Sequence, residues 1–313
     1  MPYLYNVERK ISLKIIIVTI TTVSLVVIFT YTFLANFIEK KRLKSIYDYM
    51  ALEDYNNASF IFHDLIAKKP VNKNVLIAGI DLYYDMLIRS EDHNTMILSS
   101  KNIIKYANQV LLTSQFIKNK YLIYKRLADA YQTLGQSYYK DAYLSYLDAI
   151  NNGDDRVSTI VELSKVSYEI GRYKEAIAYL EEILKIQKKQ NPNADITTIL
   201  NYELAKAYAG NKDYTKAIQI LNSLQGRFNN NTKLEFQTYF KLGELYFIQG
   251  LYQESEFFYK KALLIDEKNA ELYYSIGKLY TKIKKPSDAY YMFREALKID
   301  NSYKPARDAL RRL

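Results

Sequence analysis

Few side chains in this sequence are suited to catalysis or metal binding. Histidine occurs twice, at His63 and His93, and cysteine is absent, which excludes thiolate nucleophiles, disulfides and Cys/His zinc clusters. His63 lies in an apolar-patterned segment and His93 in a polar one, positions typical of structural or surface histidines. Glycine-rich phosphate loops and the common hydrolase, metalloprotease and EF-hand motifs are also absent. We therefore expect no enzymatic activity, no catalytic residue, no cofactor and no metal.

Charged side chains are the remaining polar chemistry, and they lie at the two ends of the chain. The formal net charge is +10, of which residues 1–44 hold +5 (seven basic, two acidic), residues 278–313 hold +6 (ten basic, four acidic) and residues 45–277 hold −1 (27 basic, 28 acidic). No block of five or six like charges occurs, so we expect no nucleic-acid partner. The basic tail suits an acidic partner or anionic lipid, or is simply solvated: its cations include Lys282, Lys284, Lys285, Arg307, Arg311 and Arg312.

The composition predicts that these side chains stand on helices. The 313 residues include only 9 Gly and 5 Pro, too few for the frequent turns of a sandwich or barrel. Tyrosine is abundant, at 32 residues, either because the genome is biased toward it or because its rings pack between helices. The predicted fold class is all-α.

The first predicted element is a membrane-spanning helix at residues 15–38. These 24 residues carry no charge and are rich in Ile, Val, Leu and Phe. A helix of this length extends roughly 36 Å, enough to cross a hydrocarbon core about 30 Å thick. Aromatic and basic residues flank the stretch, as is common at membrane interfaces. They are Tyr31, Phe33 and Phe37 inside it, and Arg9, Lys10, Lys14, Lys40, Lys41, Arg42 and Lys44 around it.

A cleaved signal peptide is the alternative, but its apolar core is usually about 7 to 15 residues long and ends at a small-x-small site. Phe33 disrupts the site that would end at Ala35, so we expect an uncleaved anchor in a membrane of the bacterial inner-membrane type. The basic residues on the two flanks are nearly balanced. A short basic N-terminus before a long domain favours an extracytoplasmic location for that domain.

A repeated pattern fills the rest of the chain. A shift of 34 residues superimposes Tyr239 on Tyr273, Gly243 on Gly277, Tyr246 on Tyr280 and Ala262 on Ala296. Within each copy the apolar positions recur three and four apart, first over about 14 residues and again after Gly250 or Pro286. This spacing predicts two amphipathic helices joined by a tight turn.

The second helix of each copy has a recurring signature, in which a small residue follows an aromatic or turn residue by three positions and a large side chain follows four later. Small residues allow helices to approach closely, and the large rings fill the space around them. One pair cannot bury its apolar face alone, so the pairs must stack. The signature begins at Tyr55, Tyr139, Tyr173, Tyr214, Tyr252 and Pro286.

This pattern resembles the tetratricopeptide repeat, although the Trp of that family is replaced throughout. The resemblance implies a right-handed superhelical solenoid of helix-turn-helix units. The copies are six or seven, because residues 73–119 are degenerate. The stretch 89–100 inserted there is either a loop or a sign that the repeats number six and not seven. The predicted organisation is a basic segment 1–14, a transmembrane helix 15–38, repeats within 39–303 (about 39–72, 73–119, 121–156, 157–197, 198–235, 236–269 and 270–303) and a capping helix 304–313.

The resemblance also implies a concave groove, lined by the first helices, that holds a peptide or partner helix. Exposed rings interleaved with charges on that face are suited to this role, since rings supply contact area and charges orient the ligand. The alternative is that some of these rings pack on neighbouring repeats. The candidate groove residues are Lys165, Tyr168, Tyr202, Lys206, Phe240, Glu244, Phe247, Tyr274 and Lys278. The family's carboxylate clamp is not expected, because Asp129 stands where that motif needs Asn, four residues after Lys125.

The sequence therefore predicts a membrane-anchored scaffold or adaptor that binds a protein or peptide in its groove and the bilayer through residues 15–38. A narrower expectation is an accessory or chaperone-like factor of protein export or envelope assembly. The alternative is a structural subunit of a larger membrane complex that uses its convex face and edges.

Overall fold

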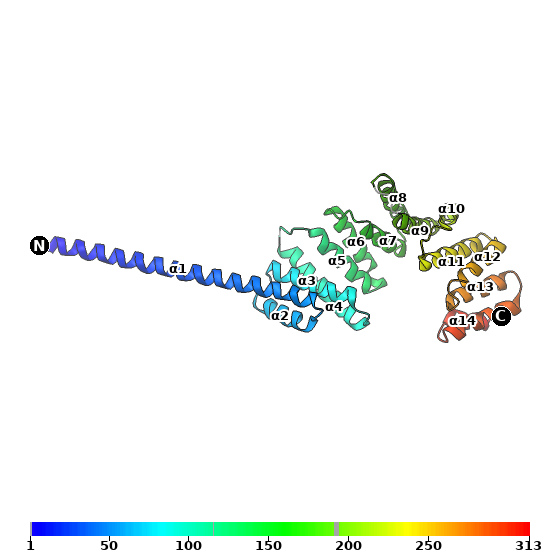
Figure 1. Ribbon diagram of the computed structural model, residues 1–313, viewed down its shortest axis with the longest axis horizontal. Helices are drawn as coiled ribbons and strands as arrows, with labels where there is room; N and C mark the ends of the chain where they lie inside the picture. Colours follow the sequence, from blue (N-terminus) through cyan, green and yellow to red (C-terminus); the bar gives the residue numbers. More distant parts are fainter. Residues whose placement is uncertain (1, 115, 191–193) are drawn as a thin grey trace. The chain divides into compact units, whose positions relative to one another are not determined.

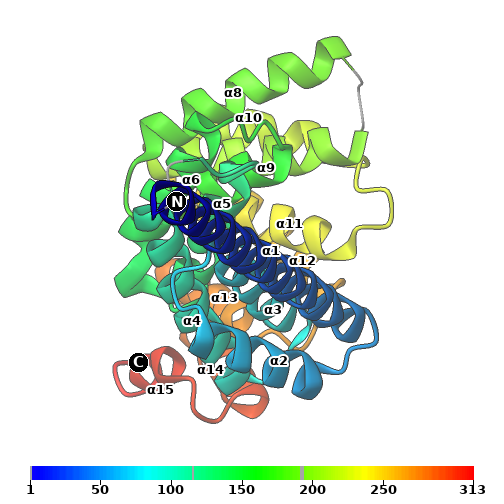
Figure 2. The same cartoon turned by 90° about the vertical axis from the view of Figure 1, so that its left-hand side faces the viewer.

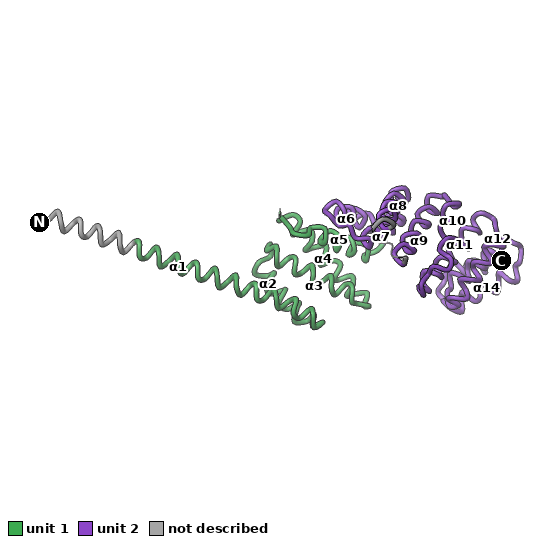
Figure 3. The backbone as a smooth tube through the Cα atoms, turned by 45° about the horizontal axis from the view of Figure 1, so that its top comes forward, with its two compact units in different colours: residues 1–135 green, residues 136–313 purple. Residues whose placement is uncertain are grey.

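The structure is a computed structural model that describes the backbone of residues 2–114, 116–190 and 194–313, and the side chains of residues 18–114, 116–187 and 195–313. Every regular element within these ranges is helical, so the predicted all-α class is confirmed (Figure 1). The chain divides into two compact units, residues 1–135 and 136–313 (Figure 3).

The helices of unit 1 are α1 Pro2–Ala51, α2 Tyr55–Lys68, α3 Lys73–Arg89, α4 His93–Thr113 and α5 Lys120–Thr133. Unit 2 begins with the short 3₁₀ turn η1 Gln136–Tyr138 and α6 Tyr139–Asn151. It continues with α7 Val157–Glu169, α8 Tyr173–Gln190, α9 Ala194–Gly210, α10 Tyr214–Leu224, α11 Thr232–Ile248, α12 Tyr252–Leu263, α13 Ala270–Lys282, α14 Pro286–Ile299 and α15 Lys304–Leu310.

The first helix of unit 1 joins the apolar segment to the first repeat without a break. α1 is 50 residues long, and every side chain from residue 18 to residue 38 is exposed. Burial begins only in its last turns, where Ile46 is fully buried and the helix packs on α2 and α3 (Figure 2). The apolar segment therefore continues into the first repeat helix as one α-helix. Residues 1–14 and the first three residues of the predicted span lie outside the described side chains.

The degenerate copy is also a helix pair. α3 and α4 pack against each other, and only residues 90–92 separate them. The interpretation of residues 89–100 as a loop is wrong, because Asp92 caps α4 by accepting a hydrogen bond from the Thr95 amide at 2.8 Å. His93 is the first residue of that helix and not part of a loop.

Unit 2 is a run of helix pairs in which first and second helices pack closely. α11 packs on α12 and α13 on α14, and α15 covers α14 at the end of the chain (red in Figure 2). The side chains of Asn231 and Asn269 cap α11 and α13, each accepting a backbone hydrogen bond at 3.0 Å. In the tight turns, Gly250 has φ 76° and Lys284 has φ 59° two residues before the second helix begins.

Small residues and rings meet directly, as the spacing predicted. A Cβ added to Gly243 would lie 2.4 Å from Cδ1 of Tyr259, and one added to Gly277 would lie 2.5 Å from Cε1 of Phe293. In these pairs the ring of the second helix lies on the glycine of the first helix of the same copy. At Gly79 the ring comes from the preceding pair instead: an added Cβ would lie 2.4 Å from Cε2 of Phe62.

Candidate protein-binding groove

The nine candidate residues stand on the first helices of four successive pairs in unit 2. α7 packs on α9, α9 on α11 and α11 on α13, so these helices form a continuous row. Lys165 and Tyr168 lie on α7, Tyr202 and Lys206 on α9, Phe240, Glu244 and Phe247 on α11, and Tyr274 and Lys278 on α13.

Four of the nine residues line a common cavity of about 290 Å³ in this row. They are Tyr168, Glu244, Phe247 and Lys278, which come from α7, α11 and α13. The sequence interval between the first and last of them exceeds 100 residues, and the stacking of the repeats brings them together. The cavity is also lined by residues of the second helices, Tyr214 on α10 and Tyr259 on α12.

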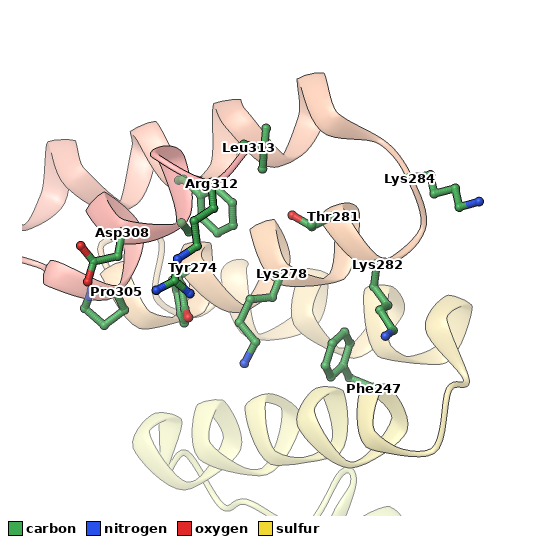
Figure 4. Close-up of a pocket in the computed structure, with 12 residues that line it drawn as sticks. Phe247, Tyr274, Lys278, Thr281, Lys282, Lys284, Pro305, Asp308, Arg312 and Leu313 are labelled. Carbon is green, nitrogen blue, oxygen red and sulfur yellow. The ribbon is translucent and has the colours of Figure 1, made fainter.

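A second cavity, of about 590 Å³, is lined by residues of α11, α13, α14 and α15 (Figure 4). Phe247, Tyr274 and Lys278 line it on one side, and Lys278 lies between the two rings. Its Nζ is 5.6 Å from the centroid of Phe247 and 5.4 Å from that of Tyr274. Both distances are in the range of a cation–π contact.

The wall formed by the end of the chain was not predicted as part of the site. Asp308, Arg312 and Leu313 line the second cavity, together with Thr281, Lys282 and Lys284 from the end of α13 and the turn after it. Leu313 is 47% exposed at the cavity. The concentration of positive charge after residue 277 was the available signal for this wall.

Four candidates line neither of these two cavities. Tyr202 is only 7% exposed and belongs to the core, so its expected solvated position is wrong. Burial raises the pKa of its hydroxyl above the ordinary value, with a further contribution from the charge of Glu203. Phe240 is half-buried and contacts the ring of Tyr259, with a centroid separation of 5.9 Å. Lys165 and Lys206 are the other two.

The equivalent charged positions along the row differ in how they are paired. Lys165 Nζ lies 2.7 Å from Glu162, Lys206 Nζ lies 3.0 Å from Glu203, and the Glu244 carboxylate lies 2.6 Å from Lys241 Nζ. Lys278 has Ser275 at the position three residues before it. No carboxylate in the described part of the chain forms an ion pair with Lys278, so its charge is uncompensated at the cavity.

The second cavity as a whole is basic. Lys278, Lys282, Lys284 and Arg312 line it beside a single acid, Asp308, whose carboxylate lies 3.8 Å from Arg311. Rings and aliphatic groups supply the rest of the wall. Among the described residues no group of three or more His, Asp or Glu is placed to hold a metal ion. The arrangement suits a ligand that carries both apolar and acidic groups.

Models of known protein families match the repeats of unit 2. Residues 167–234 match one tetratricopeptide repeat model, and a second model of the same repeat matches both 236–269 and 270–303. No curated protein matches the sequence.

Solved structures with the same fold are distant in sequence. A tetratricopeptide repeat protein from Parabacteroides merdae is 15% identical, with a TM-score of 0.62 over 87% of this chain and 97% of that one. The apo quorum sensor NprR from B. thuringiensis is 14% identical, with a TM-score of 0.61 over 87% and 78%. Part of a repeat protein from Cytophaga hutchinsonii is 20% identical, with a TM-score of 0.52 over 86% and 99%. At such identities the likeness concerns the fold alone. Together with the matched repeats and the ring-on-glycine packing, it identifies the chain as a tetratricopeptide repeat protein.

Proposed function

We propose that the protein is a membrane-anchored scaffold that binds an acidic peptide segment of a partner protein along the first helices of unit 2. Tetratricopeptide repeats and structures of this fold support a protein-interaction scaffold. The observation that carries the finer proposal is the uncompensated charge of Lys278 between two rings, in a cavity with three further cations. Acidic side chains of the partner would pair with these cations, while an apolar side chain would contact the rings of Phe247 and Tyr274 beside them.

Charge reversal at exposed residues tests this binding site without disturbing the core. We expect Lys278→Glu with Arg312→Glu to reduce the partner captured by in-cell crosslinking at least tenfold, equivalent to about 1.4 kcal/mol of binding free energy. The matched control is Lys174→Glu with Lys185→Glu on the exposed face of α8, which makes the same change in net charge. Full capture by the first variant, with its circular dichroism unchanged, would contradict the proposal.

The anchor proposal rests on α1. From Val18 onward this helix is long and apolar enough to span a membrane, with a mean hydropathy of 2.0 in its most apolar window and none of that window buried. We expect the protein to resist carbonate extraction, and Val26→Arg with Ile28→Arg to release it into the supernatant. A C-terminal reporter active only after export would support the extracytoplasmic side and, with it, a role in protein export or envelope assembly. A C-terminal reporter active only in the cytoplasm would contradict both.

A structural subunit remains the second candidate, and exposed rings on the second helices favour it. Phe257 on α12 and Tyr290 and Tyr291 on α14 are 55%, 49% and 57% exposed. If the protein is a subunit that uses this face, Phe257→Ser with Tyr291→Ser should dissociate a stoichiometric complex in detergent extracts. The Lys278 and Arg312 variant should then leave that complex intact.

A further inference from the structure

The end of unit 1 from which α1 extends is held together by hydrogen bonds at the level of Glu39. This residue directly follows the charge-free stretch that ends at Ile38. The Glu39 carboxylate pairs with Lys69 and accepts a hydrogen bond from Asn72 Nδ2 at 3.0 Å. The connection between α2 and α3 is therefore fixed beside the first polar turn of α1 after that stretch.

The connection between α4 and α5 lies at the same end. Gln109 Nε2 donates to the Pro70 carbonyl at 2.7 Å, and Lys73 Nζ donates to the Phe116 carbonyl at 3.1 Å. Both connections lie on the side of unit 1 from which the N-terminal part of α1 projects (Figure 1). At the opposite end, Arg89 of α3 pairs with Glu53, just beyond the end of α1, at 2.7 Å.

The end of unit 1 at the level of Glu39 exposes apolar side chains next to cations. Val71 is 63% exposed, Leu112 is 86% exposed and Phe116 is 85% exposed. Singly exposed apolar residues are common on protein surfaces. Here Val71 and Phe116 lie on two connections that hydrogen bonds hold at the same end of unit 1, and Leu112 lies in the last turn of α4 beside them. The exposed cations of the same end are Lys40, Lys41, Lys69, Lys73 and Lys118.

We propose that these two connections, together with the last turn of α4, form a second contact with the bilayer, in which Val71, Leu112 and Phe116 enter the headgroup region and the lysines meet anionic lipid phosphates. The proposal rests on the anchor proposed above. If α1 spans the membrane, its first polar turn lies in the headgroup region, and the two connections must lie there too. Apolar side chains flanked by lysines are the composition that such an interface favours.

This contact would fix how unit 1 stands on the membrane. α1 enters the unit as a continuous helix, so no flexible linker separates the span from the first repeat. A helix alone permits rotation about its axis and tilt. Contacts from two connections on one side of α1 would restrict both motions and hold unit 1 against the lipid surface.

Single-cysteine spin labelling tests the contact on the full chain, because the natural sequence has no cysteine. The chain is placed in vesicles of zwitterionic lipid with 30% anionic lipid, and the depth of each label is measured from its accessibility to oxygen and to a nickel complex. We expect Leu112→Cys and Val71→Cys labels to report the headgroup region. The matched control is Leu98→Cys, which is 57% exposed on the same α4, roughly 21 Å further along the helix, and should report water.

A label at Val26→Cys separates failure of this proposal from failure of the anchor. If the Val26 label reports the hydrocarbon core while the Leu112 and Val71 labels report water, the second contact is wrong and the anchor stands. If the Val26 label reports water, the anchor itself is wrong. For the lysines, Lys73→Gln with Lys118→Gln should move the Leu112 label toward water. An unchanged depth for that label would overturn their role.

Discussion

At the scale of single residues, close packing in this protein depends on rings placed against glycines. Gly243 and Gly277 occupy equivalent positions 34 residues apart, and each has a ring of the second helix where a Cβ would be. Tyr259 and Phe293, the two rings, are each 2% exposed. The room for either ring therefore exists only because the facing residue has no side chain.

Gly243→Ala should destabilise the protein, although alanine is the better helix former. The gain in helix propensity is about 1 kcal/mol, whereas overpacking a buried contact costs about 1–3 kcal/mol. The ring of Tyr259 cannot move into solvent, so we expect a net loss in the free energy of unfolding measured by urea titration. Tyr259→Leu should make the same Gly243→Ala change less costly. The exposed Gln249→Ala near the end of α11 is the control, and a stabilising Gly243→Ala would show that the ring shifts freely.

Buried tyrosines should make the protein sensitive to alkaline pH. Burial, and a hydrogen bond from the Tyr280 hydroxyl to Glu256 at 3.0 Å, raise the pKa of Tyr280 to about 12. The unfolded chain has a tyrosine pKa of about 10, so it loses this proton first as pH rises. The contribution of Tyr280 to stability is therefore complete below pH 10 and is lost as pH rises toward 12.

Tyr280→Phe removes this titration. We expect its melting temperature, followed by circular dichroism, to fall less steeply than that of the natural protein between pH 9.5 and 11. Tyr291→Phe is the control, since that hydroxyl lies on an exposed side chain. Identical pH profiles for all three proteins would contradict the assignment.

Residue spacing predicted which positions hold small residues and which hold large ones, but it did not predict how exposed each large side chain is. Tyr202, Phe240 and Tyr274 share one face of their helices, and the sequence cannot tell which of them a neighbouring element covers. The structure buries Tyr202 and half-buries Phe240, whereas Tyr274 lines a cavity at the end of the stack. Exposure in a stack depends on the element that follows, and the ring of Tyr274 faces α15 and the residue before it instead of another helix pair.

At the scale of elements, α15 packs on α14 and lines the second cavity. Ala306 is fully buried, Leu310 is half-buried and Tyr303, just before the helix, lies 5.7 Å from the ring of Tyr274. The sequence predicts this helix to be a cap, and in the structure it packs on α14. That α15 also lines the second cavity depends on where the chain turns after residue 299, and helical periodicity does not encode that turn.

Removal of residues 304–313 should loosen the last repeat first. We expect a loss of about 2–3 kcal/mol, the amount typical of one or two buried aliphatic side chains, together with reduced hydrogen-exchange protection in α13 and α14. Protection in α7 should remain, because each repeat interacts mainly with its neighbours. Arg311→Ala with Arg312→Ala is the control for lost charge. Unchanged protection of α14 after the truncation would show that α15 does not cap the stack.

At the scale of the whole molecule, most of the buried apolar side chains in the described part of the chain belong to two clusters. One runs from Ile46 to Ala130 in unit 1 and the other from Val161 to Ala306 in unit 2. Each contains large side chains with little or no exposure, such as Phe62 in unit 1 and Phe293 in unit 2. A stack of repeats transmits stability through nearest neighbours, so a defect in one cluster should remain within its own unit.

Two matched substitutions test this independence on the full chain. Phe62→Ala should cost about 3–5 kcal/mol and reduce hydrogen-exchange protection in α2, α3 and α4, because it opens a cavity against Gly79. Phe293→Ala should cost a similar amount and act on α13 and α14 instead. Each variant serves as the control for the other, since both remove one buried phenylalanine that lies on a glycine. We expect α11 to α14 to keep their protection in Phe62→Ala, and α2 to α4 to keep theirs in Phe293→Ala. Loss of protection across both units in either variant would mean that the chain unfolds as one cooperative body, because only then would a cavity in one cluster destabilise the other.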